Sequence, residues 1–112
     1  MDDRTIMWGV VSKSISEALG SEFIIRDYTP VSGGCINEAY RVEAEQQVLF
    51  VKRHHEAMAP MFQAEFEALK ELEFTQTIKV PMPICWGASE GFAWLVTSFW
   101  NWGLVTEMPR LN

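Results

Sequence analysis

The residues that suggest chemistry begin with a Ser-Gly-Gly sequence, Ser32, Gly33 and Gly34, within residues 29–40. Apolar and β-branched residues flank this sequence, so it is predicted to join two strands through a loop whose backbone can adopt positive φ angles. Because glycine has no Cβ, an anion can approach the N–H groups of Gly33 and Gly34 closely. The segment therefore predicts a hairpin that can bind an anion.

A lysine and a glutamate downstream suggest an ion pair. Lys52 ends the segment 48–52, whose apolar residues on both faces are typical of a central strand covered on both sides. Side-chain alternation puts Lys52 on the same face as Val48 and Phe50, where a charge is costly without an anionic partner. Glu65 lies inside the apolar face of the next predicted helix, which also contains Phe62, Phe66, Leu69 and Leu72. We therefore expect Lys52 and Glu65 to pair with each other.

This pair has two interpretations. It is either an internal salt bridge with no ligand, since structural ion pairs are common, or part of a functional site. The hairpin just upstream favours a nucleotide. A glycine-rich hairpin, a strand lysine and a helix glutamate, in that order, are the phosphate-binding parts of a protein-kinase-like small lobe.

The elements that must position these residues follow from the hydrophobic pattern. One helix is expected from Asp2 or Asp3 to Gly20, and a second from Pro60 to about Phe74. Strands are expected at residues 23–28, 39–43, 48–52, 84–87 and 92–96, with a turn at residues 89–91. The prediction is an α+β fold, a protein-kinase-like N-terminal lobe in which a five-stranded antiparallel sheet carries an N-terminal helix and the Glu65 helix across it.

Composition narrows the class of protein. A chain of 112 residues forms one domain at most, and its formal charge of −6 argues against a surface that coats nucleic acid. It has no run of 18 apolar residues and no signal-peptide pattern at its N-terminus, so we expect no membrane association. Cys35 and Cys85 form no CxxC motif, which favours reduced thiols in a cytoplasmic protein.

Four further residues invite functional interpretations, besides the pair already described. Adjacent histidines on a strand would face opposite ways, so we expect His54 and His55 to be an exposed pair after the strand and not a metal site. Cys85 is expected to be a buried thiol. Cys35 is expected at an exposed loop tip, where a redox role and a passive role both remain open.

The sequence resembles the N-terminal lobe of the fructosamine/ketosamine-3-kinase family, within the aminoglycoside-phosphotransferase-like branch of the kinase fold. The matching segments are residues 29–42, Phe50-Val51-Lys52, Met61-Phe62 with Ala64-Glu65, and residues 80–87. The resemblance implies ATP-dependent phosphorylation of the sugar 3-hydroxyl of ketosamines. It also implies that Lys52 contacts the ATP phosphates and that Glu65 holds Lys52. The phosphates would be covered by a loop made of Ser32, Gly33, Gly34, Cys35, Ile36 and Asn37.

The sequence departs from the family pattern in three places. His54 stands where the family usually has Asn, and the predicted hinge, Thr97-Ser98-Phe99, lacks the usual acidic residue. A hinge that binds adenine through its backbone tolerates this change, so Ser98 and Phe99 remain candidate nucleotide contacts. Full family members continue into a C-terminal lobe with a His-Gly-Asp motif and a metal-binding Asp. Here the only acidic residue after the hinge is Glu107, so we expect no catalytic base and no Mg²⁺ ligand in this chain, and no turnover by it alone.

Three functional hypotheses follow from these residues. The first is a ketosamine-kinase small lobe over residues 1–98, followed by the hinge and the start of a missing lobe at residues 99–112. The second is a standalone nucleotide-binding or regulatory module, and the third is a non-catalytic interaction domain. The apolar segment from Phe99 onward predicts self-association into a homo-oligomer.

Overall fold

The computed structural model describes residues 3–31, 38–44, 47–75 and 81–98. In these ranges the chain forms two long helices, five strands and a short 3₁₀ helix. The order is α1 (Asp3–Leu19), β1 (Asp27–Pro30), β2 (Glu38–Glu43), β3 (Val48–His55), η1 (Glu56–Met58), α2 (Ala59–Thr75), β4 (Pro83–Ser89) and β5 (Phe92–Ser98). None of the described helices is both long and apolar enough to cross a membrane.

The five strands form one antiparallel sheet in the order β1-β2-β3-β5-β4. β3 is therefore the central strand, as its apolar sequence predicts. The helix α2 connects β3 to the edge strand β4, and β5 then returns between them. The predicted α+β fold with a five-stranded antiparallel sheet is confirmed.

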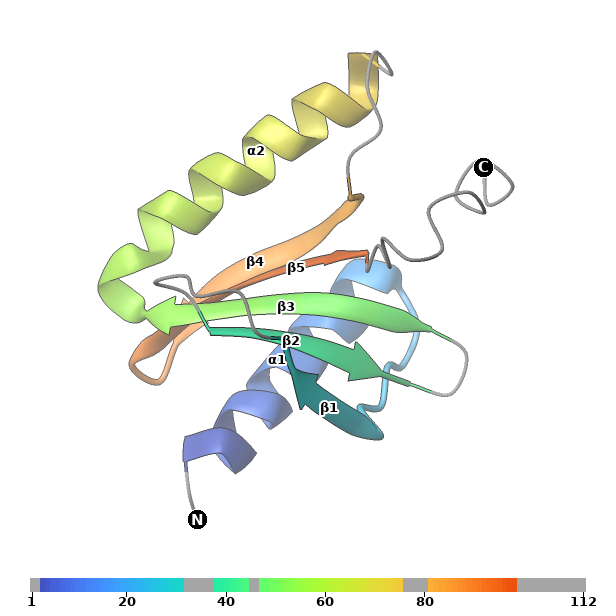
Figure 1. The fold of residues 1–112 in the computed structure, drawn as a ribbon, viewed down its shortest axis with the longest axis vertical. Helices are drawn as coiled ribbons and strands as arrows, with labels where there is room; N and C mark the ends of the chain where they lie inside the picture. The colour runs from blue at the N-terminus through green and yellow to red at the C-terminus, as the bar shows by residue number, and fades with distance from the viewer. Residues whose placement is uncertain (1–2, 32–37, 45–46, 76–80, 99–112) are drawn as a thin grey trace.

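The two long helices cover opposite faces of the sheet (Figure 1). On the α1 face, Met7, Val11 and Ile15 are fully buried and pack with alternate residues of β2, β3 and β5 in the larger core cluster. On the α2 face, Phe62 packs with Ala93 and Leu95 in a smaller cluster. The central strand thus contributes alternate side chains to two different environments.

The predicted boundaries hold for the helices but need correction in the sheet. β3 runs to His55, three residues beyond its predicted end at Lys52. The helix α1 ends at Leu19, and Gly20 follows with φ of 76°, the left-handed conformation expected after a helix C-terminus. The first strand begins at Asp27 rather than at residue 23, so this prediction was wrong by four residues. The reason is that serines of α1 bind the backbone of Phe23: its N–H donates to Ser16 Oγ at 2.8 Å, and its carbonyl accepts from Ser12 Oγ at 2.5 Å. With both groups engaged, Phe23 has no need of a strand partner.

Candidate functional site

The candidate site is centred on an ion pair between β3 and α2. Lys52 Nζ donates to Glu65 Oε2 at 2.5 Å, which confirms the predicted pairing. The side chain of Lys52 is 22% exposed and that of Glu65 is 37% exposed, so the pair is partly shielded and still open to water. A ligand could therefore reach the Lys52 ammonium without displacing the Glu65 carboxylate from it.

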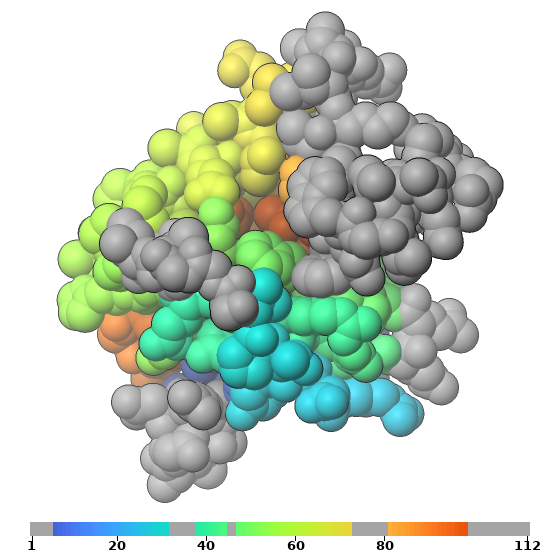
Figure 2. Space-filling model, viewed as in Figure 1, coloured from blue at the N-terminus to red at the C-terminus, as the bar shows by residue number. Residues whose placement is uncertain are grey.

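The helix α2 is held over the sheet by apolar residues of β5 below it. Phe62, one turn before Glu65, is fully buried against Ala93 and Leu95 of β5. Leu95 is also the Cα partner of Lys52 across the β3–β5 ladder. The Phe62 contact and the Lys52–Glu65 pair therefore lie next to each other, and Figure 2 shows the surface of α2 meeting that of the sheet. We expect the packing at Phe62 to help set how close Glu65 comes to the lysine.

The predicted hairpin closes directly beside Lys52. The Val31 N–H donates to the Ala39 carbonyl at 2.9 Å, and this bond ties the end of β1 to the start of β2. Ala39 is in turn the Cα partner of Lys52 in the β2–β3 ladder. The predicted loop residues, Ser32, Gly33, Gly34, Cys35, Ile36 and Asn37, lie outside the described residues. The structure does bring the ends of this segment to the lysine, as the motif order requires.

Ser98, the candidate hinge residue, is already bound to the segment that precedes β4. Its N–H donates to the Met82 carbonyl at 2.8 Å, and its Oγ accepts from the Met82 N–H at 2.9 Å. Its carbonyl accepts from Thr97 Oγ1 at 3.0 Å and has a second lone pair. Of the Ser98 backbone groups, only this carbonyl can bind a nucleotide base without breaking the sheet. Phe99 lies outside the described residues.

The two histidines make local hydrogen bonds, and the His54 Nδ1 accepts from the His55 N–H at 2.7 Å. His54 is half-buried and His55 exposed, and both belong to β3, so the prediction of an exposed pair after the strand was wrong for their position and for the exposure of His54. The His55 Nδ1 accepts from the Ala57 N–H at 3.0 Å and so caps η1. Within the described part of the chain, no three His, Cys, Asp or Glu side chains are placed to hold a metal ion.

Cys85 is a buried free thiol, as predicted. Burial raises the pKa of this thiol, while a hydrogen bond from Ser14 Oγ, 3.5 Å from Sγ, acts in the opposite direction on the pKa. The thiol is therefore kept neutral in the core, and it is a packing residue rather than a nucleophile.

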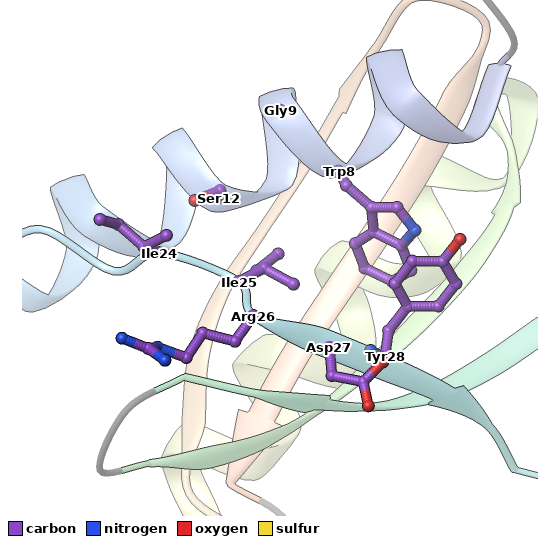
Figure 3. Close-up of a pocket in the computed structure, with 8 residues that line it drawn as sticks. All are labelled: Trp8, Gly9, Ser12, Ile24, Ile25, Arg26, Asp27 and Tyr28. Atoms are coloured by element: carbon purple, nitrogen blue, oxygen red, sulfur yellow. Dashed lines mark hydrogen bonds between the residues drawn. The ribbon is translucent and has the colours of Figure 1, made fainter.

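A groove of about 350 Å³ lies on the α1 side of the molecule, away from Lys52. Figure 3 shows that Trp8 and Ser12 of α1 border it on one side and Ile25 and Tyr28 on the other. Because α1 and α2 cover opposite faces of the sheet, this groove is separate from the Lys52–Glu65 pair. Sequence reasoning gave no sign of it.

Sequence reasoning also missed a second ion pair at the base of the hairpin. Arg53 Nη1 donates to Glu38 Oε1 at 2.7 Å, and Glu38 is the Cα partner of Arg53. Both residues adjoin features that the sequence did single out, since Arg53 follows Lys52 and Glu38 follows the Ser-Gly-Gly loop. Opposite charges at these two places were the available signal, but it becomes meaningful only once the strand register is known.

Comparison with known proteins agrees with this arrangement. A family model described as fructosamine kinase matches residues 7–110. A probable ketoamine kinase of Synechocystis sp. is 41% identical over 96 residues, which cover 86% of this chain and 32% of the relative. A probable ketoamine kinase of Vibrio cholerae is 33% identical over 93 residues, covering 83% of this chain and 32% of the relative.

A solved structure shows the same fold. A protein of Haemophilus somnus 129PT, described as a putative fructosamine-3-kinase, superimposes with a TM-score of 0.78 at 30% sequence identity. The match covers 81% of this chain and 31% of that one. The chain thus spans about a third of the length of the relatives it matches. On the family match over residues 7–110 and this shared fold, the chain belongs to the fructosamine kinase family.

Proposed function

We propose that this chain is the N-terminal, nucleotide-binding lobe of a fructosamine/ketosamine-3-kinase-like protein, and that its ligand is ATP. The single observation that carries this proposal is the Lys52–Glu65 pair, at 2.5 Å, beside the closing bond of the β1–β2 hairpin. A shielded lysine held by a helix carboxylate at the base of a glycine-containing hairpin is suited to bind phosphate oxygens.

The main predicted site residues have distinct roles in this proposal. Lys52 contacts the phosphates, and Glu65 holds its ammonium group in place. The backbone of the Ser-Gly-Gly loop covers the phosphates, because N–H groups of residues without a Cβ can approach an anion. Ser98 contributes its carbonyl to the adenine, and Phe99, which follows it in the sequence, is the second proposed hinge contact.

The activity of the whole protein is a further step of the proposal. The relatives are described as ketoamine kinases and as a fructosamine-3-kinase, and they are about three times as long as this chain. We propose that the longer protein transfers phosphate from ATP to the sugar 3-hydroxyl of ketosamines in the cytoplasm. In this scheme residues 1–98 are the small lobe and residues 99–112 begin the connection to a second lobe.

The described residues gather no set of side chains that would hold a Mg²⁺ ion by themselves. Mg²⁺ requires oxygen ligands in near-octahedral geometry, and the described part of the chain has no three acidic, Cys or His side chains gathered for that purpose. We therefore propose that metal binding and the general base belong to the C-terminal lobe of the longer protein. The 112-residue chain is then expected to bind nucleotide weakly and to show no turnover.

Calorimetric titration of ATP into the chain tests the proposal. Lys52→Met should weaken binding at least tenfold, because it removes the phosphate-binding charge, which corresponds to about 1.4 kcal/mol. Glu65→Gln should weaken it less, since the lysine remains but loses its fixed position. Lys70→Met is the matched control, because Lys70 is an exposed lysine of α2, the helix that carries Glu65.

Three results would contradict the proposal. Equal ATP affinity of the wild-type chain and Lys52→Met would remove the assigned role of the lysine. Tight, Mg²⁺-dependent binding by the isolated chain would instead support a standalone nucleotide-binding module. The remaining hypothesis, a non-catalytic interaction domain, is supported by a chain that binds no nucleotide at all.

A further inference from the structure

The second ion pair lies at the base of the hairpin, on the face of the sheet opposite to Lys52. Glu38 is the first residue of β2, and Arg53 follows Lys52 on β3. Since successive side chains of a strand point to opposite faces, Lys52 faces α2 whereas Arg53 faces the α1 side. The two neighbouring cations of β3 are thus each bound by a carboxylate, on opposite faces of the sheet.

The carboxylate of Glu38 is bound from two directions. Its Oε1 accepts from Arg53 Nη1 at 2.7 Å and from the Tyr40 hydroxyl at 2.8 Å. The Arg53 guanidinium also lies 5.6 Å from the centre of the Phe92 ring, in a cation–π contact that orients it. A surface ion pair by itself contributes little to the stability of a fold. When a phenol and an aromatic ring already hold its side chains in place, forming the pair costs less side-chain entropy.

Tyr40 links this pair to the rest of the fold. It is 4% exposed, and its ring packs edge-on against Trp8 of α1, with centroids 5.1 Å apart. Tyr28 of β1 packs against both rings, at 4.7 Å from Trp8 and 5.9 Å from Tyr40, and Figure 3 shows the Trp8 and Tyr28 rings lying together. This aromatic cluster of Trp8, Tyr28 and Tyr40 therefore joins both strands of the hairpin to the helix beneath them.

The base of the hairpin needs such support. β1 is an edge strand of four residues, and its open side has no neighbouring strand in the described sheet. Short edge elements with few buried contacts open most easily in folded proteins. We infer that Glu38 and Arg53, acting through Tyr40, are positioning residues that hold the hairpin base for nucleotide binding, without contacting the nucleotide themselves. This inference rests on the proposed function above.

The test compares Glu38→Gln with Glu43→Gln. The control removes the same charge from the same strand, where Glu43 pairs with Arg41, about 17 Å from Glu38 at about 3.4 Å per residue. Glu38→Gln should raise the Kd for ATP about fivefold, which corresponds to about 1 kcal/mol. Glu43→Gln should leave it unchanged, and both variants should have similar melting temperatures. Arg53→Met should behave like Glu38→Gln, whereas Arg53→Lys, which keeps the charge, should recover part of the affinity.

A second measurement needs no nucleotide. Hydrogen exchange of the Val31 amide reports the bond that closes the hairpin, and Glu38→Gln should accelerate it about fivefold relative to Glu43→Gln. Unchanged exchange at Val31 in Glu38→Gln overturns the inference, whatever the nucleotide result. Faster exchange with an unchanged Kd also overturns it, because the hairpin base would then not matter for binding. Failure of the wild-type chain to bind ATP overturns the proposed function, and with it the role assigned to this pair.

Discussion

At the scale of single residues, the site depends on two adjacent cations that serve different faces of one strand. Lys52 is paired with Glu65 from a helix, and Arg53 is paired with Glu38 from the neighbouring strand. Each pairing offsets the cost of placing a charge near the packed sheet. Because the Lys52 ammonium is a compact charge with three donors, it can add a phosphate oxygen to its carboxylate partner. We propose that the Arg53 guanidinium instead holds the Glu38 carboxylate, and with it the base of the hairpin, in place.

Gly87 gives a residue-scale prediction about packing. A Cβ added at this position of β4 would lie 2.5 Å from Cζ2 of Trp94, whose indole is buried and donates to Ser14 Oγ at 3.3 Å. The buried ring cannot move aside without disturbing the core, so we expect Gly87→Ala to destabilise the fold by about 1–3 kcal/mol. Urea denaturation followed by tryptophan fluorescence measures this change.

Gly9 provides the control for that experiment. It lies inside α1, and an added Cβ would meet nothing within 4 Å. Because alanine has the higher helix propensity, Gly9→Ala should be neutral or stabilise the fold by up to about 1 kcal/mol. If Gly87→Ala proved as harmless as Gly9→Ala, the inference that the Trp94 ring leaves no room for a Cβ at Gly87 would be wrong.

At the scale of elements, Phe62 is the one fully buried residue among the α2 residues whose side chains the structure describes. Phe62 is fully buried in the smaller core cluster, whereas Phe66, Leu69 and Leu72 are only half-buried. We therefore expect Phe62→Ala to cost about 3–5 kcal/mol and to weaken ATP binding, because the helix that carries Glu65 loses its main contact. Thermal unfolding and ATP titration of the same samples measure both effects.

The matched control for the helix anchor is Phe66→Ala, one turn further along the same face. Since Phe66 is partly exposed, its loss should cost clearly less than the loss of Phe62. Equal losses of stability in the two variants would mean that α2 is held along its whole length, and that Phe62 has no special role in placing Glu65.

At the scale of the whole molecule, the final segment is expected to mediate self-association. Residues 99–112 are rich in large apolar side chains, namely Phe99, Trp100, Trp102, Leu104, Val105, Met108 and Leu111. Apolar surface of this kind, when exposed, usually marks an interface. We expect the full chain to form a homodimer or a larger assembly, and a chain ending at Ser98 to be monomeric. Light scattering across a concentration series distinguishes these states, and a monomer in both samples would contradict the expectation.

The sequence by itself determined the elements and the central ion pair. Lys52 and Glu65 each interrupt an apolar face, and the periods of two for a strand and 3.6 for a helix are enough to show this. The turn at Gly91 and the helix end at Gly20 were likewise predictable, because both glycines adopt positive φ angles, which a residue without a Cβ tolerates. These features depend on residues close together in the chain.

Only the tertiary structure decided which distant residues meet. Phe23 leaves the first strand because serines of α1 bind its backbone, and Gly87 is required by the Trp94 ring on the neighbouring strand. Glu38 and Arg53 pair because the β2–β3 register sets them opposite each other. A local pattern of hydrophobicity cannot specify such contacts, since they depend on the order, register and spacing of packed elements. The physical reason is that burial and charge determine which face a side chain occupies, whereas packing determines its partner.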